Sequence, residues 1–243
     1  MKKGIRTSIG IKILTGVIAL LLLLAGAFLF YVSDYYHADA AVAASSSQEE
    51  PKEKNGALLY GPEDAETALI FYPGGKVEYT AYQPLMEKIA EKGILCILPK
   101  MPFNLAVFDV NAADKYITDF PQVSHWYVGG HSLGGSMAAA YATEHSDNVE
   151  GVVLLASYGT TDLTMEGMRV LSIYGSEDRV LNRESYLDNK SNLPKGFSEL
   201  VIQGGNHGGF GCYGQQKGDG EASISQDRQQ EETGDAVTAF LLQ

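Results

Sequence analysis

Cysteine is scarce in this chain of 243 residues, which contains two, Cys96 and Cys212. Two cysteines exclude the kind of disulfide framework that stabilises small secreted domains, and the sequence leaves open whether these two form a bond. The histidine and cysteine spacing of a zinc site is also missing. We therefore expect no metal site, and a core of ordinary apolar side chains as the basis of the fold.

Positive charge is in short supply as well. The chain has 18 Lys and Arg residues against 30 Asp and Glu residues, a formal net charge of −12. Four of the basic residues, Lys2, Lys3, Arg6 and Lys12, precede the first acidic residue, Asp34, so the remainder is more acidic still. Such a surface repels phosphate groups, and we expect no nucleic-acid partner.

Residues 13–32, ILTGVIALLLLLAGAFLFYV, lack charge altogether. A run of this length is sufficient to cross a bilayer, and basic residues before it place the N-terminus in the cytoplasm. A cleaved signal peptide is the alternative, because Ala38-Asp39-Ala40 resembles a cleavage site. A buried core helix is disfavoured, since the run has no polar face.

These features predict a basic cytoplasmic segment over 1–12, a transmembrane helix over 13–32, a flexible linker over 33–56 and one domain over 57–243. The predicted localisation is a single-pass membrane protein whose domain lies outside the cytoplasm, or a secreted domain if the leader is cleaved. The membrane is thus an expected partner through the N-terminal helix.

Within the domain, short apolar runs alternate with helical patterns. Strands are predicted at 57–60, 68–72, 94–98, 125–128, 151–156, 170–174 and 197–203. Helices are predicted at 82–92, 110–119, 136–144, 182–189 and 235–242, the last within a longer helical region of uncertain start. Continuously apolar strands between helices indicate an α/β fold with a mostly parallel sheet covered on both faces. Reactive groups in such folds gather at the carboxyl ends of the strands.

The stretch Gly130-His131-Ser132-Leu133-Gly134 lies between a predicted strand and a helix rich in alanine. Strand, sharp turn and helix are the setting of a nucleophile elbow, which exposes the hydroxyl group of its central serine. The flanking glycines relieve crowding at a strained turn. A glycine-rich turn with an incidental serine is the alternative, but the context favours Ser132 as a nucleophile.

A serine nucleophile needs a base, and the base needs an acid. Of the five histidines, His207 follows the last predicted strand in a glycine-rich loop, which makes it the predicted base. Asp178, after the strand over 170–174, is the predicted acid. Glu177 is the close rival and Asp162 the more distant one. A turn or helix-start role is the alternative for Asp178.

An acyl transfer reaction also needs two N–H donors for the developing oxyanion. The backbone of Leu133 supplies one at the start of the predicted helix. The second is predicted at Gly75 or Lys76, in the turn Pro73-Gly74-Gly75-Lys76 after an earlier strand. A plain glycine turn is the alternative.

Together these residues resemble the α/β-hydrolase superfamily, in particular a small group with little lid structure akin to dienelactone hydrolases. The similar stretches are Tyr72–Gly75, Gly130–Gly134, Tyr174–Asp178 and Gly205–His207, in the chain order nucleophile, acid, base. The resemblance implies a sheet of the eight-stranded type and a Ser-His-Asp acyl hydrolase without a cofactor.

Two departures bear on the resemblance. Pro73 stands where many relatives have histidine, and Ser132 stands where dienelactone hydrolases use cysteine. The second departure argues against transferring the dienelactone substrate to this chain.

The segment over 157–168 is too short for a helical lid, so an open site is expected. Phe103, Tyr158 and Met165 are predicted to line an apolar acyl pocket. The predicted function is hydrolysis of a small-molecule carboxylic ester or related acyl substrate. A peptidase or thioesterase of the same fold, or a hydrolase-like binding module without activity, remains an alternative.

Overall fold

The computed structural model describes residues 2–40 and 51–243, with the side chains of 2–10 left aside. Contacts divide the chain after Tyr35 into two units, and each is described by itself. The first unit is the helix α1, Lys2–Ser33. Its part Ile11–Ser33 is long and apolar enough to cross a membrane or to act as a signal sequence, and it contains the predicted span over 13–32.

The second unit is built on an eight-stranded sheet in the order β1-β2-β4-β3-β5-β6-β7-β8. The strands are β1 Lys52–Lys54, β2 Ala57–Tyr60, β3 Thr67–Tyr72, β4 Leu95–Pro99, β5 His125–His131, β6 Gly151–Leu155, β7 Arg169–Gly175 and β8 Ser198–Ile202. The pairs β1–β2 and β2–β4 are antiparallel, and all the others are parallel. The carboxyl ends of the parallel strands therefore share one edge of the sheet.

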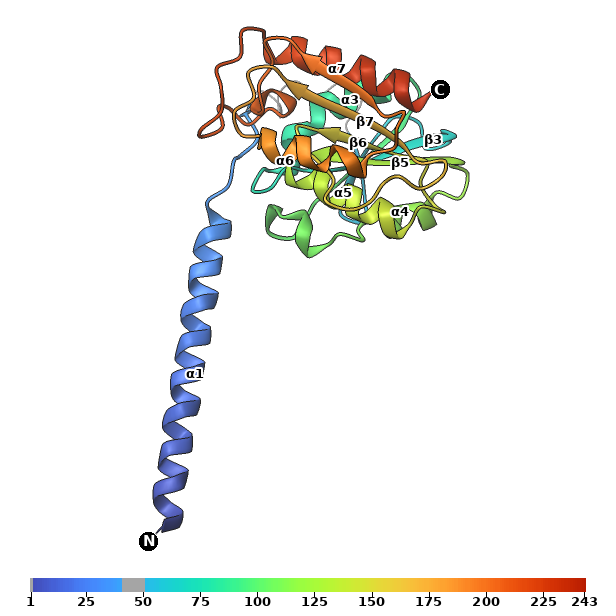
Figure 1. The fold of residues 1–243 in the computed structure, drawn as a ribbon. Helices are drawn as coiled ribbons and strands as arrows, with labels where there is room; N and C mark the ends of the chain where they lie inside the picture. The colour runs from blue at the N-terminus through green and yellow to red at the C-terminus, as the bar shows by residue number, and fades with distance from the viewer. Residues whose placement is uncertain (1, 41–50) are drawn as a thin grey trace. The chain divides into compact units, whose positions relative to one another are not determined.

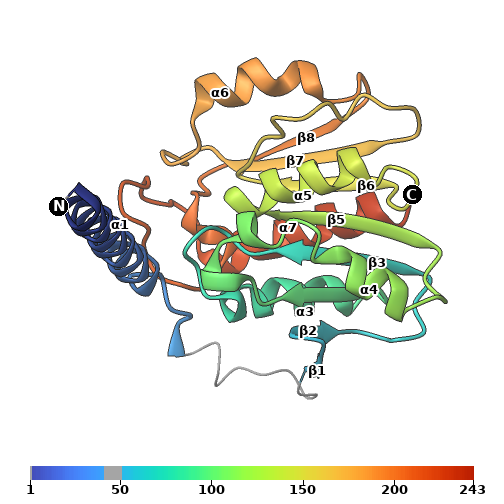
Figure 2. The same cartoon turned by 90° about the horizontal axis from the view of Figure 1, so that it is seen from below.

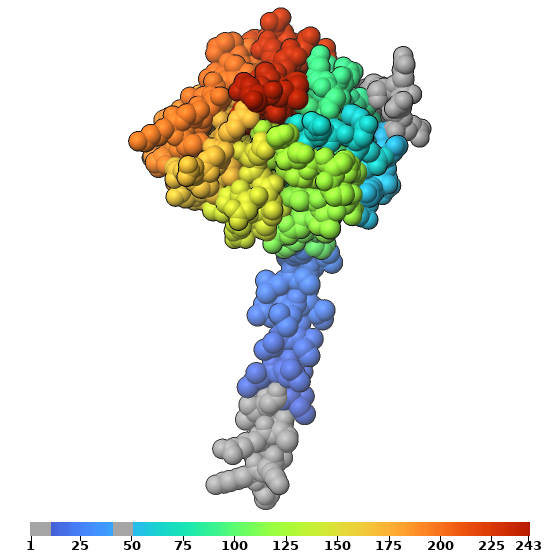
Figure 3. All heavy atoms as spheres, turned by 90° about the vertical axis from the view of Figure 1, so that its right-hand side faces the viewer, coloured from blue at the N-terminus to red at the C-terminus, as the bar shows by residue number. Residues whose placement is uncertain are grey.

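Helices cover both faces of this sheet. They are α3 Gln83–Ala90, α4 Ala113–Asp119, α5 Leu133–Glu144, α6 Arg183–Asp188 and α7 Gln226–Leu241. In Figures 1 and 2, α3 and α7 lie together on one face, and α4 and α5 lie on the other. The space-filling view in Figure 3 shows the C-terminal end of the chain, in red, at the surface. The predicted α/β fold with a mostly parallel sheet covered by helices is confirmed.

Side chains of β3 show how one strand supplies both faces. Ala68, Ile70 and Tyr72 belong to the core cluster under α4 and α5, whereas Leu69 and Phe71 belong to the cluster under α3 and α7. Successive side chains of a strand point to opposite faces, so a strand buried on both sides reads as one continuous apolar run. This is why the sequence predicts such strands well.

Most elements differ from their predicted ranges by a residue or more, and three of these differences are described here. The short edge strand β1 was not predicted, because its residues Lys52–Lys54 are charged and carry no strand pattern. The helix α4 begins at Ala113, not Val110, because the Tyr72 hydroxyl donates to the Val110 carbonyl and accepts the Ala113 N–H. The helix α5 begins three residues earlier than predicted, directly after Ser132.

The predicted linker over 33–56 contains β1 and the segment Tyr36–Asp39, which belong to the larger unit and are hydrogen-bonded to other parts of it. Residues 41–50 of this linker lie outside the described residues. The question of cysteine pairing has an answer in the structure, where Cys96 and Cys212 are both free and buried. Burial raises the pKa of each thiol, which keeps both protonated.

Candidate active site

Ser132 occupies the sharp turn between β5 and α5 in a conformation that serine rarely adopts. Its φ is 51° and its ψ is −122°. A non-glycine residue in such a conformation costs roughly 1–3 kcal/mol, and its neighbours must hold it there. The Ser132 N–H donates to the Leu155 carbonyl at 2.9 Å, and the Ser157 hydroxyl donates to the Ser132 carbonyl at 2.7 Å. The strained turn is thus fastened to the neighbouring strand β6.

The elbow lies against the end of β3 with no room for a side chain between them. A Cβ atom added at Gly134 would collide with the carbonyl oxygens of Tyr72 and Pro73. At Gly130 it would lie 2.6 Å from the Tyr72 oxygen. These two glycines bring the serine turn and the Pro73–Lys76 turn together, which is where an oxyanion site is required.

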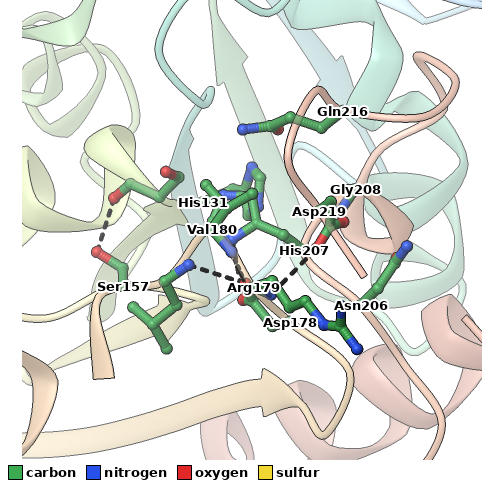
Figure 4. Close-up of polar contacts among 12 residues, drawn as sticks. His131, Ser157, Asp178, Arg179, Val180, Asn206, His207, Gly208, Gln216 and Asp219 are labelled. Carbon is green, nitrogen blue, oxygen red and sulfur yellow. Dashed lines mark hydrogen bonds and ion pairs between the residues drawn. The ribbon is translucent and has the colours of Figure 1, made fainter. Parts of the chain in front are cut away.

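Two predicted residues from different loops form a buried pair. His207 Nδ1 and Asp178 Oδ2 are 2.9 Å apart, and their side chains are 1% and 0% exposed. Asp178 follows β7 and His207 follows β8, and Figure 4 shows the two side chains pointing toward each other. The other Asp178 oxygen, Oδ1, accepts the N–H groups of Val180 and Leu181 at 2.9 and 2.8 Å. The carboxylate is therefore fixed in orientation.

Neither rival acid contacts this histidine. The Glu177 carboxylate accepts a hydrogen bond from the Ser176 hydroxyl at 3.1 Å. Asp162 Oδ1 accepts both the hydroxyl and the N–H of Thr164, and the hydroxyl hydrogen bond is the main reason why the pKa of Asp162 is lowered. Geometry thus favours Asp178 among the three.

Two residues that the sequence did not single out hold the His207 loop. The buried Gln229 side chain of α7 accepts the Asn206 N–H at 3.0 Å and donates to the Asn206 carbonyl at 2.8 Å. The Asp219 carboxylate accepts the Gly208 N–H at 2.8 Å. A glutamine on the inner face of a C-terminal helix was the available signal for the first of these contacts.

The loop Gly214–Gly220 is connected to the loops that carry Asp178 and His207. Asp219 Oδ1 accepts the Arg179 N–H at 3.3 Å, next to Asp178, while its Oδ2 binds Gly208, next to His207. Figure 4 shows Asp219 beside His207. This loop therefore ties the acid loop to the base loop.

The second ring nitrogen of His207 has no partner. Nε2 is buried, and no hydrogen bond from it is present within residues 2–40 and 51–243, including one to Ser132. The ring nevertheless lies next to the elbow, because its centroid is 4.5 Å from that of His131, the residue before Ser132. A buried nitrogen without a partner calls for an explanation, and catalytic hydrogen bonds are often open before substrate binds.

The structure separates the two predicted donors of the Pro73–Lys76 turn. The Lys76 N–H is taken, since it donates to the Asn104 carbonyl at 2.7 Å. The Gly75 N–H has no acceptor within the described part of the chain. A Cβ atom on Gly75 would lie 2.8 Å from the Leu133 side chain, so Gly75 faces the start of α5. Of the predicted donors, Gly75 and Leu133 are therefore the pair that the geometry favours for an oxyanion site.

Beneath the elbow, His131 and Tyr82 form a fully buried hydrogen-bonded pair. His131 Nδ1 and the Tyr82 hydroxyl are 2.8 Å apart, and the same hydroxyl accepts the Gly74 N–H at 3.0 Å. Burial raises the pKa of Tyr82, so the phenol keeps its proton and donates it to Nδ1. Burial, with a smaller contribution from His207, holds the pKa of His131 well below 6.5, so its ring stays neutral.

This neutral histidine has a consequence for stability in acid. Unfolded His131 takes up a proton near pH 6.5, whereas the folded residue does so only at much lower pH. His131 therefore favours the folded state fully above about pH 6.5. Each pH unit below that value lowers the free energy of unfolding by up to about 1.4 kcal/mol. In His131→Asn, which keeps a partner for Tyr82, the loss of unfolding free energy between pH 7.5 and 5.5 should be smaller by about 1 kcal/mol. Urea unfolding followed by Trp126 fluorescence measures the free energy of unfolding at the two pH values. The same pH dependence in His131→Asn and the parent would contradict the prediction.

The residues predicted to line a pocket are less closely grouped. Phe103 is 49% exposed with φ at 56°, and its ring contacts Phe108 edge-on at 5.6 Å. Tyr158 is half-buried, and its carbonyl accepts the Ser136 hydroxyl at 2.8 Å. Met165 packs against the core under α4 and α5. Their contact with substrate stays a prediction. Among the described residues, no group of His, Cys, Asp and Glu side chains is arranged to hold a metal ion.

Comparisons with known proteins agree with this fold. Among curated proteins, none matches the sequence. Est1E from Butyrivibrio proteoclasticus is similar in structure over 80% of this chain and 98% of its own, with 16% identity and a TM-score of 0.58. A dienelactone hydrolase from Anabaena variabilis matches over 76% and 90%, with 14% identity and a TM-score of 0.55. A monoacylglycerol lipase from Paleococcus ferrophilus matches over 76% and 97%, with 14% identity and a TM-score of 0.57.

The family described as the alpha/beta hydrolase family matches residues 68–231, from β3 into α7. This range includes the serine turn, the acid loop and the histidine loop. The strand order, the strained turn before α5 and this match all agree. The chain belongs to the alpha/beta hydrolase family.

Proposed function

We propose that this hydrolase cleaves carboxylic esters or related acyl compounds with Ser132 as nucleophile, His207 as base and Asp178 as the acid that orients it. The observation that carries the proposal is the buried His207–Asp178 pair, whose imidazole ring lies beside the residue before the strained Ser132 and keeps Nε2 without a partner among the described residues. Because Asp178 holds the Nδ1 proton of His207, Nε2 is the ring nitrogen that can accept a proton.

In the first half of the reaction, the Ser132 oxygen attacks the ester carbonyl carbon and its proton passes to His207 Nε2. The negative charge moves to the carbonyl oxygen, where the N–H groups of Leu133 and Gly75 stabilise it. The C–O bond to the alcohol then breaks, and His207 returns the proton to the leaving oxygen. Asp178 keeps the Nδ1 proton and stabilises the imidazolium while it exists.

In the second half, water attacks the acyl group on Ser132 and gives one proton to His207 Nε2. The oxyanion forms again between Leu133 and Gly75. When the intermediate collapses, Ser132 regains its proton from His207 and the carboxylic acid is released. No cofactor is needed for either half.

An ester is the favoured substrate for two reasons. The structurally similar proteins include Est1E and a monoacylglycerol lipase, whose names indicate ester hydrolysis. Residues 156–168, between β6 and β7, contain no helix and leave this side of the site without a lid domain. An open site suits small acyl substrates, whereas interfacially activated lipases close theirs with helices.

The proposed location is the outer side of a membrane, with α1 as anchor. Basic residues precede the apolar helix and Asp34 follows it, as expected when the N-terminus stays in the cytoplasm. An exported domain that is cut free of its leader is the other outcome.

The test of the proposed function uses the full-length chain in detergent and a fluorophosphonate probe. The probe should attach to Ser132 with one-to-one stoichiometry, and p-nitrophenyl acetate, butyrate and octanoate should be hydrolysed, with the chain-length preference indicating the pocket size. A folded protein that neither labels at Ser132 nor hydrolyses any of the three is a binding module, not an esterase.

A membrane-impermeant version of the same probe tests the location in intact cells. Labelled protein in the membrane fraction supports the anchor, and labelled protein in the medium supports leader cleavage. Labelling that appears only after lysis would place the domain in the cytoplasm.

A further inference from the structure

The segment Tyr36–Asp39, called the strap below, lies along the turn that carries the Gly75 donor. The Tyr36 N–H donates to the Lys76 carbonyl at 2.8 Å, and the Glu78 N–H donates to the Tyr36 carbonyl at 2.8 Å. Tyr36 and Val77 form a parallel β-bridge. The strap therefore adds one step of parallel sheet to the residues that follow Gly75.

The strap also binds the loop that follows His207. The Asp39 N–H donates to the Cys212 carbonyl at 2.8 Å, and the Tyr36 hydroxyl accepts the Lys217 N–H at 3.1 Å. The Tyr36 ring lies 5.5 Å from the Tyr213 ring. Four residues thus join the oxyanion turn to the histidine loop.

The contact with Tyr213 continues into the site. The Tyr213 ring is 6.5 Å from that of Tyr82 and 6.4 Å from that of His131. Tyr82 accepts the Gly74 N–H, and the His131 ring adjoins His207. Behind the catalytic residues, an unbroken group of aromatic rings therefore connects Tyr36 to both halves of the site.

The turn that the strap holds is strained. Lys76 has a φ of 59°, in the left-handed region that residues other than glycine rarely adopt. On one side its N–H is held by the Asn104 carbonyl, and on the other its carbonyl is held by Tyr36. Without the Tyr36 hydrogen bond, the carbonyl side of Lys76 loses the contact that opposes relaxation of its strained φ, and we expect the direction of the neighbouring Gly75 N–H to change with it.

We propose that the strap is a positioning element of the active site, which fixes the Gly75 N–H toward the oxyanion. The proposal rests on the proposed esterase function for its catalytic consequence. Tyr36 touches no reacting atom and acts through Lys76. A segment that merely passes over the surface would affect folding stability but not the turnover of folded enzyme.

The test compares three variants of the full-length chain in detergent. Tyr36→Pro removes the N–H that binds Lys76. Tyr36→Phe keeps the ring and the hydrogen bonds of the Tyr36 backbone, and it loses only the hydroxyl that accepts the Lys217 N–H. Tyr36→Ala keeps the hydrogen bonds of the Tyr36 backbone without the ring. For p-nitrophenyl butyrate, Tyr36→Pro should lower kcat by about 10–100-fold with KM nearly unchanged, since misplacing a catalytic group by about 1 Å costs about a hundredfold. Tyr36→Phe should have the parental kcat. Tyr36→Ala should have a kcat between those of Tyr36→Pro and the parent.

Fluorophosphonate labelling and hydrogen exchange separate positioning from unfolding. Folded Tyr36→Pro should still label Ser132 to completion, but more slowly, and its Glu78 amide should exchange faster than in Tyr36→Phe. A parental kcat in folded Tyr36→Pro overturns the proposal. If Tyr36→Pro does not fold, Glu78→Pro decides, because it removes the N–H that binds the Tyr36 carbonyl at a residue whose φ of −60° suits proline. A parental kcat in Glu78→Pro then overturns the proposal.

Ester hydrolysis and Ser132 labelling of the parent protein alone decide whether the esterase function is correct. If the parent neither hydrolyses esters nor labels at Ser132, the proposed function fails, and the Glu78 amide then decides whether the strap holds the turn. If the Glu78 amide exchanges at the same rate in Tyr36→Pro and Tyr36→Phe, the strap does not hold the turn, and the proposal is overturned even when the esterase function fails.

Discussion

Ser132→Ala is expected to lower kcat for p-nitrophenyl butyrate by about a thousandfold or more, because loss of the nucleophile leaves only the oxyanion donors and binding. KM should change little, since the hydroxyl group is not needed to hold the ground state. The thermal midpoint, measured on the same preparation, should not fall. Alanine accepts the strained φ of 51° no better than serine, but it keeps the hydrogen bonds of the turn, because residue 132 makes them with its backbone N–H and carbonyl.

The matched control is Ser146→Ala, at an exposed serine just beyond the end of α5. Its kcat should stay within about twofold of the parent, as is usual for surface substitutions. Ester hydrolysis that survives in Ser132→Ala at the parental rate would assign the nucleophile to another residue. Equal loss in both variants would point to a general effect on folding.

The backbone of the fold was predictable from the sequence because burial on both faces makes a strand continuously apolar. For this reason the strand predicted over 68–72 agrees with the observed strand β3 to within one residue. The charged strand β1 and the start of α7 were not predictable in the same way. The inner face of α7 carries the buried polar residues Gln229, Gln230 and Thr233, so no apolar stripe marks its first turns.

The elbow was predictable because its requirements are local. A strand, a serine between glycines and a helix rich in alanine are adjacent in the sequence, and the strained φ of Ser132 follows from that order. The choice between Gly75 and Lys76 was not local. It depends on the Asn104 carbonyl, which lies on a distant loop and takes the Lys76 N–H.

The strap was missed for a related reason. Its contacts with Lys76, Glu78 and Cys212 are mainly made by backbone atoms, and backbone hydrogen bonds leave no trace in the residue types of the segment. The small and polar residues that follow the apolar helix predict a flexible linker. The structure instead joins Tyr36–Asp39 to the candidate site, which is why we propose that the residues after the helix affect catalysis.

Asp178→Asn is expected to lower kcat by roughly 10³–10⁴-fold, because the hydrogen bonds around the side chain dictate how an amide would be oriented. The N–H groups of Val180 and Leu181 point at Oδ1, so the amide oxygen must take that position. The amide NH₂ group then faces His207 Nδ1, in place of the acceptor Oδ2. Nδ1 must become the acceptor, and the ring proton moves to Nε2.

A His207 ring protonated at Nε2 cannot accept the Ser132 proton, so acylation slows while substrate binding is unaffected. The loss should therefore fall on kcat and on the rate of fluorophosphonate labelling, with KM nearly unchanged. Glu177→Gln is the matched control, an acid-to-amide change at the neighbouring position, and its kcat should stay within about threefold of the parent because its carboxylate binds Ser176 and not the histidine. A larger loss in Glu177→Gln than in Asp178→Asn would transfer the role of the acid to Glu177.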